Sequence, residues 1–87
     1  MKVEFKESFL KDLKKIKDSE VKKKIRKLIR EVEKTSFNMI KGLKKIKGYK
    51  DYYRIRIGNY RIGISKEGGT IVFVRVLHRK DLYRYFP

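Results

Sequence analysis

Residues 52–64 read YYRIRIGNYRIGI, and this stretch decides the fold. Apolar or aromatic side chains alternate with other residues on both sides of a central Gly58-Asn59 pair. Alternation of this kind is typical of a strand with one buried face, and a two-residue glycine–asparagine turn is typical of a tight hairpin. We therefore predict strands over 52–57 and 60–65, joined by this turn.

The turn also fixes the register of the hairpin, because a two-residue loop leaves little freedom in which residues pair. It sets Ile55 opposite Ile62 and Arg56 opposite Arg61. The apolar face then carries Tyr53, Ile55, Ile57, Tyr60, Ile62 and Ile64. The other face carries Tyr52, Arg54, Arg56, Arg61 and Gly63. Two arginines directly opposite each other repel, so such a pair is retained cheaply where water screens it and usefully where an anion binds.

A third strand is expected over 70–77, after a three-residue loop at 67–69 that pairs Lys66 with Thr70. This register predicts that Val72, Val74 and Val76 join the apolar face. It also predicts that Phe73, Arg75, Leu77 and Arg79 join the cationic face.

The preceding segments predict one strand and two helices. Residues 2–6 alternate as a short strand does. Ser8 is the expected cap of a first helix, and Asp18 or Ser19 of a second. Their apolar faces are Phe9, Leu10, Leu13 and Ile16, then Val21, Ile25, Leu28, Ile29 and Val32.

The two remaining segments are less regular. In the 35–48 connection we expect Phe37, Met39, Ile40, Leu43 and Ile46 to pack under the loop, with a short strand at its end. Residues 80–86 are read as a helical turn or short extension. The result is one α+β domain over residues 1–87 in the order β-α-α-β-β-β, with a helical hairpin on one face of an antiparallel sheet.

The composition indicates a polyanionic partner. Lys and Arg number 26 against 10 acidic residues, a formal net charge of +16. With no cysteine and one histidine, the chain is expected to hold neither a metal nor another cofactor. The sequence contains no apolar run long enough for a membrane span, so we expect a cytoplasmic protein that does not engage membranes.

The cationic strand face has two interpretations from its residues alone: a solvated basic surface, or a nucleic-acid site. Arginine binds phosphate bidentately, and tyrosine rings stack on unpaired bases, which favours RNA. RNA cleavage needs no metal, because the ribose 2′-OH can attack the adjacent phosphate while cations stabilise the charge that develops. His78 is the one side chain whose ordinary pKa lies near neutrality, but the predicted register points it away from Arg79.

Two stretches, Ile46–Ile62 and Val72–Tyr83, resemble the RelE family of toxin–antitoxin systems. The preceding strand and helical hairpin follow the order of elements in that family. The resemblance implies a RelE-like fold and a metal-free endoribonuclease that cleaves mRNA in the ribosomal A site and so inhibits translation. It also implies neutralisation by an acidic or amphipathic RelB-like antitoxin.

The resemblance also implies residue roles. The family's basic catalytic residues correspond to Arg54, Arg56, Arg61 and Arg79. Its C-terminal tyrosine corresponds to Tyr85, or to Tyr83 if the spacing is shorter. Further RNA contacts are expected from Lys44, Lys45, Lys47, Tyr52 and Arg75.

One departure from the family concerns the proton acceptor. Some members carry lysine where this chain has Arg54, and arginine is a poor base because it stays protonated. The acceptor is then His78, or a group of the ribosome or substrate, or the proton leaves late without a dedicated base.

Two other functions are compatible with the sequence. One is a ParE-like toxin of the same fold that inhibits DNA gyrase through protein contacts. The other is a family member that binds RNA or the ribosome without cleaving.

Overall fold

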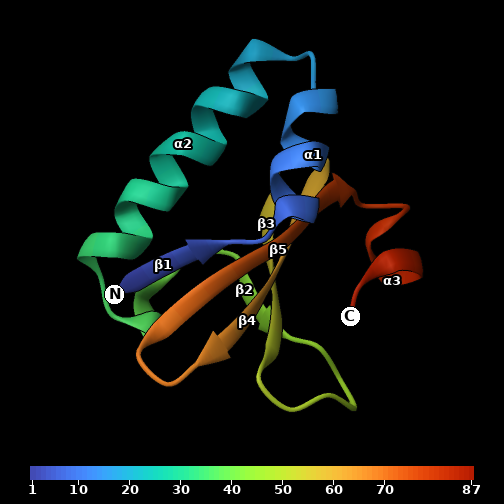
Figure 1. The fold of residues 1–87 in the computed structure, drawn as a ribbon. Helices are drawn as coiled ribbons and strands as arrows, with labels where there is room; N and C mark the ends of the chain where they lie inside the picture. The colour runs from blue at the N-terminus through green and yellow to red at the C-terminus, as the bar shows by residue number, and fades with distance from the viewer.

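The computed structural model describes residues 1–87 and has the expected α+β architecture (Figure 1). Its elements, in chain order, are β1 (Lys2–Phe5), α1 (Glu7–Lys15), α2 (Ser19–Lys34), the 3-10 turn η1 (Phe37–Met39), β2 (Leu43–Lys45), β3 (Tyr52–Ile57), β4 (Tyr60–Glu67), β5 (Thr70–His78) and α3 (Leu82–Tyr85). No helix combines the length and the apolar character needed to cross a bilayer.

The five strands form one sheet in the order β1-β5-β4-β3-β2. The expectation of a purely antiparallel sheet is wrong at one edge, because β1 pairs with β5 in parallel. The two helices between β1 and the rest of the sheet provide the long connection that a parallel pair requires. β2, the short strand expected at the end of the irregular connection, pairs with β3 at the other edge.

The register of the β3–β4 hairpin is confirmed at every predicted pair. Arg56 lies opposite Arg61, Ile55 opposite Ile62, and Tyr53 opposite Ile64. Ile55, Ile62 and Ile64 are fully buried beneath the helices. We call this side of the sheet the helix face, and the side that carries Arg54, Arg56 and Arg61 the open face.

The register predicted for β5 is wrong over its first half. The turn has two residues rather than three, since Glu67 pairs with Thr70. Phe73 therefore pairs with Ile64 and lies fully buried on the helix face, whereas Val72 lies opposite Ser65 on the open face. An irregularity between Gly63 and Ile64 leaves Val74 unpaired, which restores the predicted alternation from Arg75 onwards.

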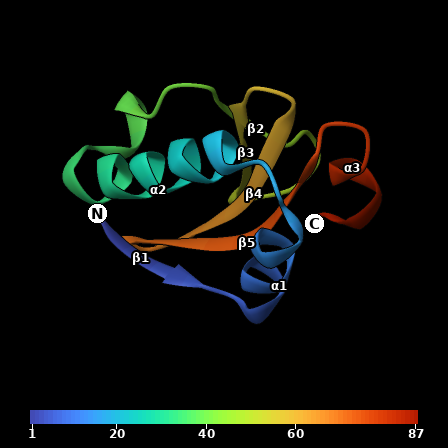
Figure 2. The ribbon, with the colours of Figure 1, turned by 90° about the horizontal axis from the view of Figure 1, so that it is seen from above.

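Both helices contribute to the core on the helix face. Figure 2 shows α2 running along the sheet and α1 lying beside the β1–β5 edge. Phe9 of α1 packs against Phe73 at 5.4 Å between ring centroids, and Ile25 and Val32 of α2 are buried with them. Leu10, expected in this core, is 46% exposed instead. The core thus joins the helices to β3, β4 and β5.

Of the two expected helix caps, the cap of α2 is confirmed and the cap of α1 is wrong. Asp18 caps α2 by accepting hydrogen bonds from the backbone N–H groups of Glu20 and Val21. Ser8 is not the cap of α1, because the helix begins at Glu7 and Lys6 therefore occupies the N-cap position. Its hydroxyl donates instead to the Val74 carbonyl at 2.6 Å, so Ser8 ties α1 to the free edge of β5.

A second, smaller cluster lies on the open face. Ile46, Leu82 and Phe86 are buried there, with Tyr52, Val74 and Leu77 packed around them. In the irregular connection, Ile40 and Ile46 are buried as expected, but Met39 is 70% exposed. The small cluster holds α3, the helical turn expected within 80–86, against the open face.

Candidate functional site

Four arginines gather at one end of the open face: Arg54 and Arg56 on β3, Arg61 on β4, and Arg79 just after β5. We call these four the arginine set. The β3–β4 pairing sets Arg56 opposite Arg61, and the Arg79 backbone N–H donates to the Asn59 carbonyl at 2.8 Å. This last bond holds the end of β5 beside the hairpin turn, and so brings a distant residue to the set.

Arg54 is held by the backbone of the loop before β2. Its Nη1 donates to the Gly42 carbonyl at 2.7 Å, and the same carbonyl accepts the Arg56 backbone N–H at 3.0 Å. Gly42 has φ +76°, and a Cβ there would lie 2.9 Å from the Arg56 carbonyl oxygen, so only glycine fits. The Arg54 Nε is buried and has no partner within the chain.

The charges of the other three arginines of the set all act on Arg61. Its Nη1 donates to the carbonyls of Gly58 and Tyr60, each at 2.9 Å. Burial lowers the pKa of the Arg61 guanidinium, and the neighbouring charges of Arg56, Arg54 and Arg79 lower it further, whereas Tyr83 acts in the opposite direction. The set therefore has an electrostatic cost that a bound anion relieves.

No carboxylate neutralises the set. The ion pairs in the chain join Lys11 to Glu7, Lys23 to Glu20 and Arg75 to Asp12, and none includes a member of the set. The hydrogen bonds that members do make go to backbone carbonyls. Guanidinium groups fixed in this way, with charge unpaired, are suited to holding a phosphate.

The two C-terminal tyrosines of α3 lie beside different arginines. Tyr83 is 62% exposed and influences Arg61, so it lies beside the arginine set. The Tyr85 ring lies 5.6 Å from the guanidinium carbon of Arg75, outside the set. Of the two tyrosines, Tyr83, the candidate obtained with the shorter spacing, is thus the one whose charge acts on a member of the arginine set, Arg61.

Arg75, expected to contact RNA, is occupied by a partner within the chain. Its Nε and Nη2 donate to the two oxygens of Asp12 at 2.7 and 3.0 Å. Asp12 is only 5% exposed and also accepts the Val76 backbone N–H at 3.1 Å. This contact fastens α1 to the part of β5 that extends beyond β1.

His78 lies apart from the arginine set. It pairs with Tyr60, the neighbour of Arg61, and therefore shares the helix face with Tyr60. The two rings lie 5.8 Å apart at 70°. The His78 Nδ1 accepts the Lys80 backbone N–H at 3.3 Å. Histidine and the arginine set are thus on opposite faces of the sheet.

The remaining expected RNA contacts have mixed placements. Tyr52 packs edge-on against Phe86 at 5.6 Å between centroids, within the small cluster. Lys44 is exposed and pairs with Arg54, so it shares the open face. Lys45 lies opposite Tyr53 in the β2–β3 pair and therefore belongs to the helix face. Lys47 is exposed in the turn after β2.

Sequence reasoning missed Gly63, which positions α3. A Cβ at this residue would lie 2.7 Å from the Phe86 ring, so the missing side chain makes room for that ring on the open face. The signal available in the sequence was a glycine within a strand, which often marks a close approach by another segment.

The comparisons assign the chain to a class. The model of the ParE toxin family of type II toxin–antitoxin systems matches residues 3–83. The chain therefore belongs to the RelE/ParE superfamily of toxins.

Among individual proteins, the chain is 54% identical to toxin RelE3 of Methanocaldococcus jannaschii, over the full length of both chains. It is 50% identical to a chain in the crystal structure of the RelB–RelE antitoxin–toxin complex from Methanococcus jannaschii. The TM-score is 0.84, and the match covers 97% of this chain and 99% of that one. The Escherichia coli RelBE complex, at 22% identity and a TM-score of 0.67 over 86% of this chain and 92% of that one, shares the fold.

Proposed function

We propose that this toxin is a ribonuclease that cleaves mRNA on the translating ribosome without a metal ion, with the arginine set as its active site. One observation carries the proposal: four guanidinium groups converge on the open face with no carboxylate to neutralise them. The toxin class of the chain agrees with an activity that stops growth.

The arginine set supplies the electrostatic part of the reaction. When the ribose 2′-oxygen attacks the adjacent phosphate and loses its proton, a pentacovalent phosphorane with extra negative charge develops. The phosphorane collapses by breaking the P–O5′ bond, which leaves a 2′,3′-cyclic phosphate and a 5′-oxygen that takes up a proton. In this proposal Arg61 and Arg79, whose charges act on each other, stabilise the negative charge of the phosphorane, and Arg54, tethered to Gly42, fixes the phosphate. Tyr83 offers an exposed ring for stacking on a base of the bent strand.

A proton acceptor within the chain is missing from this site. Arginine is a poor base in proteins, and His78 lies on the other face of the sheet. We infer that the 2′-OH proton passes to a group of the ribosome or of the substrate, which would make cleavage depend on the ribosome.

An antitoxin is the second part of the proposed function. The Methanococcus jannaschii relative was crystallised with RelB, and we propose that a RelB-like protein neutralises this toxin in the cytoplasm. Such a protein would be acidic, because the net charge to be met is +16.

The test is to incubate the purified chain with ribosomes stalled on a defined mRNA and to map the mRNA ends. The expected result is a cut within the A-site codon that leaves a 2′,3′-cyclic phosphate on the upstream fragment, the product of attack by the 2′-OH. Naked mRNA is the control and should stay intact. Intact codons on ribosomes at stoichiometric toxin would contradict the proposal, and ribosome binding without a cut would indicate a non-catalytic member.

A second candidate function comes from the family model itself, which describes a ParE toxin. A ParE-like toxin would inhibit DNA gyrase through protein contacts. Cells in which expression of this chain is induced would separate the two functions: DNA breaks with intact mRNA favour gyrase inhibition, and cut mRNA with intact DNA favours the ribonuclease.

A further inference from the structure

A pocket of about 420 Å³ lies at the free edge of β5, beyond the end of β1. β1 pairs with β5 only as far as Phe73, and α1 continues along the edge from there. Figures 1 and 2 show the end of β5 with α1 beside it and α3 close by. We call this hollow the edge pocket. It is lined by residues of α1, β4, β5 and α3, among them Lys15, Tyr60, Arg75, Val76, His78 and Tyr85.

Three rings line the edge pocket. The Tyr60 and His78 rings lie 5.8 Å apart at 70°, and the Tyr85 ring lies 5.6 Å from the Arg75 guanidinium carbon. Tyr85 is 53% exposed, so much of its surface is left for a ligand to cover. Rings of this kind stack on unpaired nucleobases.

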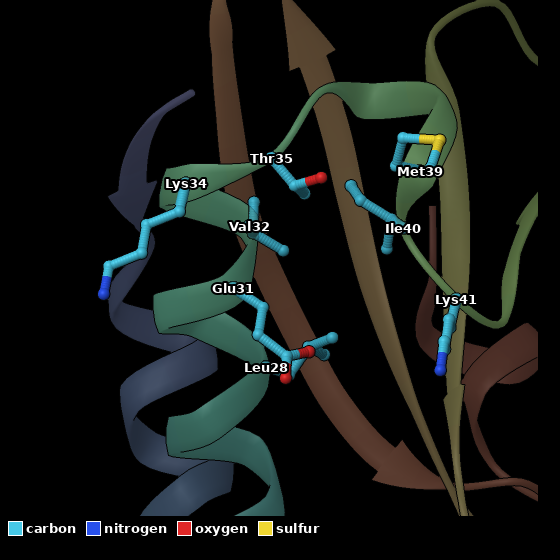
Figure 3. A pocket seen from close by; sticks show the side chains of 8 residues that line it. All are labelled: Leu28, Glu31, Val32, Lys34, Thr35, Met39, Ile40 and Lys41. Atoms are coloured by element: carbon cyan, nitrogen blue, oxygen red, sulfur yellow. The ribbon is translucent and has the colours of Figure 1, made fainter.

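A second hollow lies beside α2 and has different chemistry. Figure 3 shows Leu28 and Val32 extending from α2 toward Ile40. The lining of this hollow has no aromatic side chain and no arginine. A base would find nothing to stack on there, so the edge pocket is the better candidate for a nucleotide.

The edge of β5 supplies two free main-chain groups. The Val76 N–H donates to Asp12 at 3.1 Å, so the main-chain groups of Val76 point away from β4. Both groups of a residue in an antiparallel strand point to the same side, and the residue two positions on repeats the direction. The Val76 C=O and the His78 N–H therefore face the free edge, whereas the His78 C=O accepts the Asp81 N–H at 2.8 Å. One acceptor beside one donor matches the Watson–Crick edge of an unpaired base.

The unpaired positive charge of the edge pocket is that of Lys15. Lys15 forms no ion pair, whereas the charge of Arg75 is met by Asp12. The Arg75 Nη1 takes no part in that contact and is a further donor. Asp12 is the one acidic residue in the lining, and both its oxygens already accept hydrogen bonds. Rings beside a free cation suit a ligand with a flat base and a phosphate.

We propose that the edge pocket binds one unpaired nucleotide of single-stranded RNA, with its base among the three rings and its phosphate at Lys15. Tyr60 and His78 directly precede Arg61 and Arg79, and successive residues of a strand lie on opposite faces. RNA held at the arginine set therefore passes round the edge of β5 to reach the pocket. This rests on the proposed function for the source of the RNA, which is the mRNA beside the cleaved codon or the ribosomal RNA around it.

The test titrates the full chain with AMP and follows the ring signals of Tyr60, His78 and Tyr85 by NMR. AMP should shift these signals. Ribose 5-phosphate has no base and is free to bind the arginine set, so it should leave them in place. If AMP leaves the ring signals unmoved, or if ribose 5-phosphate moves them equally, the edge pocket is not a nucleotide site. Either result would leave the arginine set and the ribonuclease untouched.

Two variants on different elements sharpen the titration. Tyr85→Ala should weaken AMP binding about tenfold, as the loss of one base–ring stack does, and Tyr85→Phe should keep it. Lys15→Gln should weaken binding and reduce its salt dependence. The matched controls are Tyr49→Ala, at a 51% exposed tyrosine outside the pocket, and Lys14→Gln, at the neighbouring lysine of α1. Controls that weaken binding as much as the pocket variants would overturn the assignment.

Ribosomes distinguish the two sources of the RNA. If Tyr85→Ala and Lys15→Gln both bind ribosomes without mRNA more weakly than wild type, the nucleotide belongs to ribosomal RNA. If both bind normally but cut mRNA more slowly, it belongs to the mRNA. Wild-type binding and wild-type cutting in both variants would overturn the assignment to RNA. If AMP binds at the pocket but wild type cuts no codon, the edge pocket stands and the ribonuclease fails.

Discussion

Arg75 and Arg79 follow each other closely at the end of β5 but lie in opposite electrostatic surroundings. Arg75 binds the nearly buried Asp12 through two hydrogen bonds, so its charge is neutralised within the fold. Arg79 joins three further arginines, and no member of this set has a carboxylate partner. The difference indicates that the first arginine serves stability, whereas the arginine set has its charge available for a ligand.

The largest expected effect is on catalysis at Arg79. Its replacement in Arg79→Ala should lower mRNA cleavage on ribosomes by about 100- to 1,000-fold, as removal of one charge-stabilising donor does in other enzymes. The Arg79 side chain forms no ion pair in the fold, so the melting temperature should hardly change. An unchanged cleavage rate would remove Arg79 from the active site.

The next effect is on stability at Asp12. Asp12→Ala leaves Arg75 without its partner and the Val76 N–H without its acceptor, which should cost about 2 to 4 kcal/mol in urea unfolding. The matched control is Glu7→Ala, which breaks an exposed ion pair with Lys11 and should cost less than about 0.5 kcal/mol. Equal losses in the two variants would contradict the structural role of the Asp12–Arg75 contact.

A third substitution, at Gly63, should disturb the packing of α3 and Phe86 on the open face. Gly63→Ala places a methyl group against the Phe86 ring, and should destabilise the fold by about 1 to 3 kcal/mol. It should also slow cleavage, because Tyr83 moves with α3. Gly69→Ala is the control, since nothing lies within 4 Å of a Cβ there. Unchanged NMR signals of Phe86 and Tyr83 in the Gly63 variant would contradict this view.

The smallest effect is a gain in stability at Arg56. Arg56→Gln removes a like charge opposite Arg61, and should stabilise the free protein by about 0.5 kcal/mol at low salt, while cleavage falls. Added salt should reduce the difference in the free energy of unfolding between the variant and the wild type, because salt screens the repulsion. Urea titrations at two salt concentrations measure both, and a variant less stable than wild type at low salt would argue against repulsion within the set.

The lowered pKa of Arg61 gives the sign of the corresponding pH dependence. Because folding lowers the pKa of Arg61, protonation of this group reduces the free energy of unfolding. This penalty disappears only as the pH rises through the pKa of Arg61. At neutral pH the penalty is constant. Removal of Arg56 should raise the pKa of Arg61 toward its ordinary value.

Much of the fold follows from local rules, and these predictions were confirmed. The Gly58-Asn59 turn and the alternation around it set the whole register of β3 and β4. Asp18 caps α2 because an aspartate before an amphipathic run satisfies the first free N–H groups. These features depend on residues close in sequence, so no knowledge of distant contacts was needed.

The rest depended on contacts between distant residues. Phe73 and Val72 lie on the faces opposite to those predicted. The two-residue turn and the compensating irregularity at Val74 allow Phe73 to pack on Phe9. Ser8 became a strand-edge donor because β1 ends and leaves the edge of β5 open. Local pattern alone gives no signal for either change.

By itself the sequence determined the hairpin, the opposition of Arg56 and Arg61, and the excess of positive charge, because backbone geometry and composition act locally. Only the tertiary structure decided which arginines stay unpaired. Asp12 is 63 residues from Arg75 in the chain, and α1 must fold back along β5 before the carboxylate reaches its partner. The placement of Tyr83 beside the arginine set, and of His78 on the other face, was decided in the same way, by packing across the sheet.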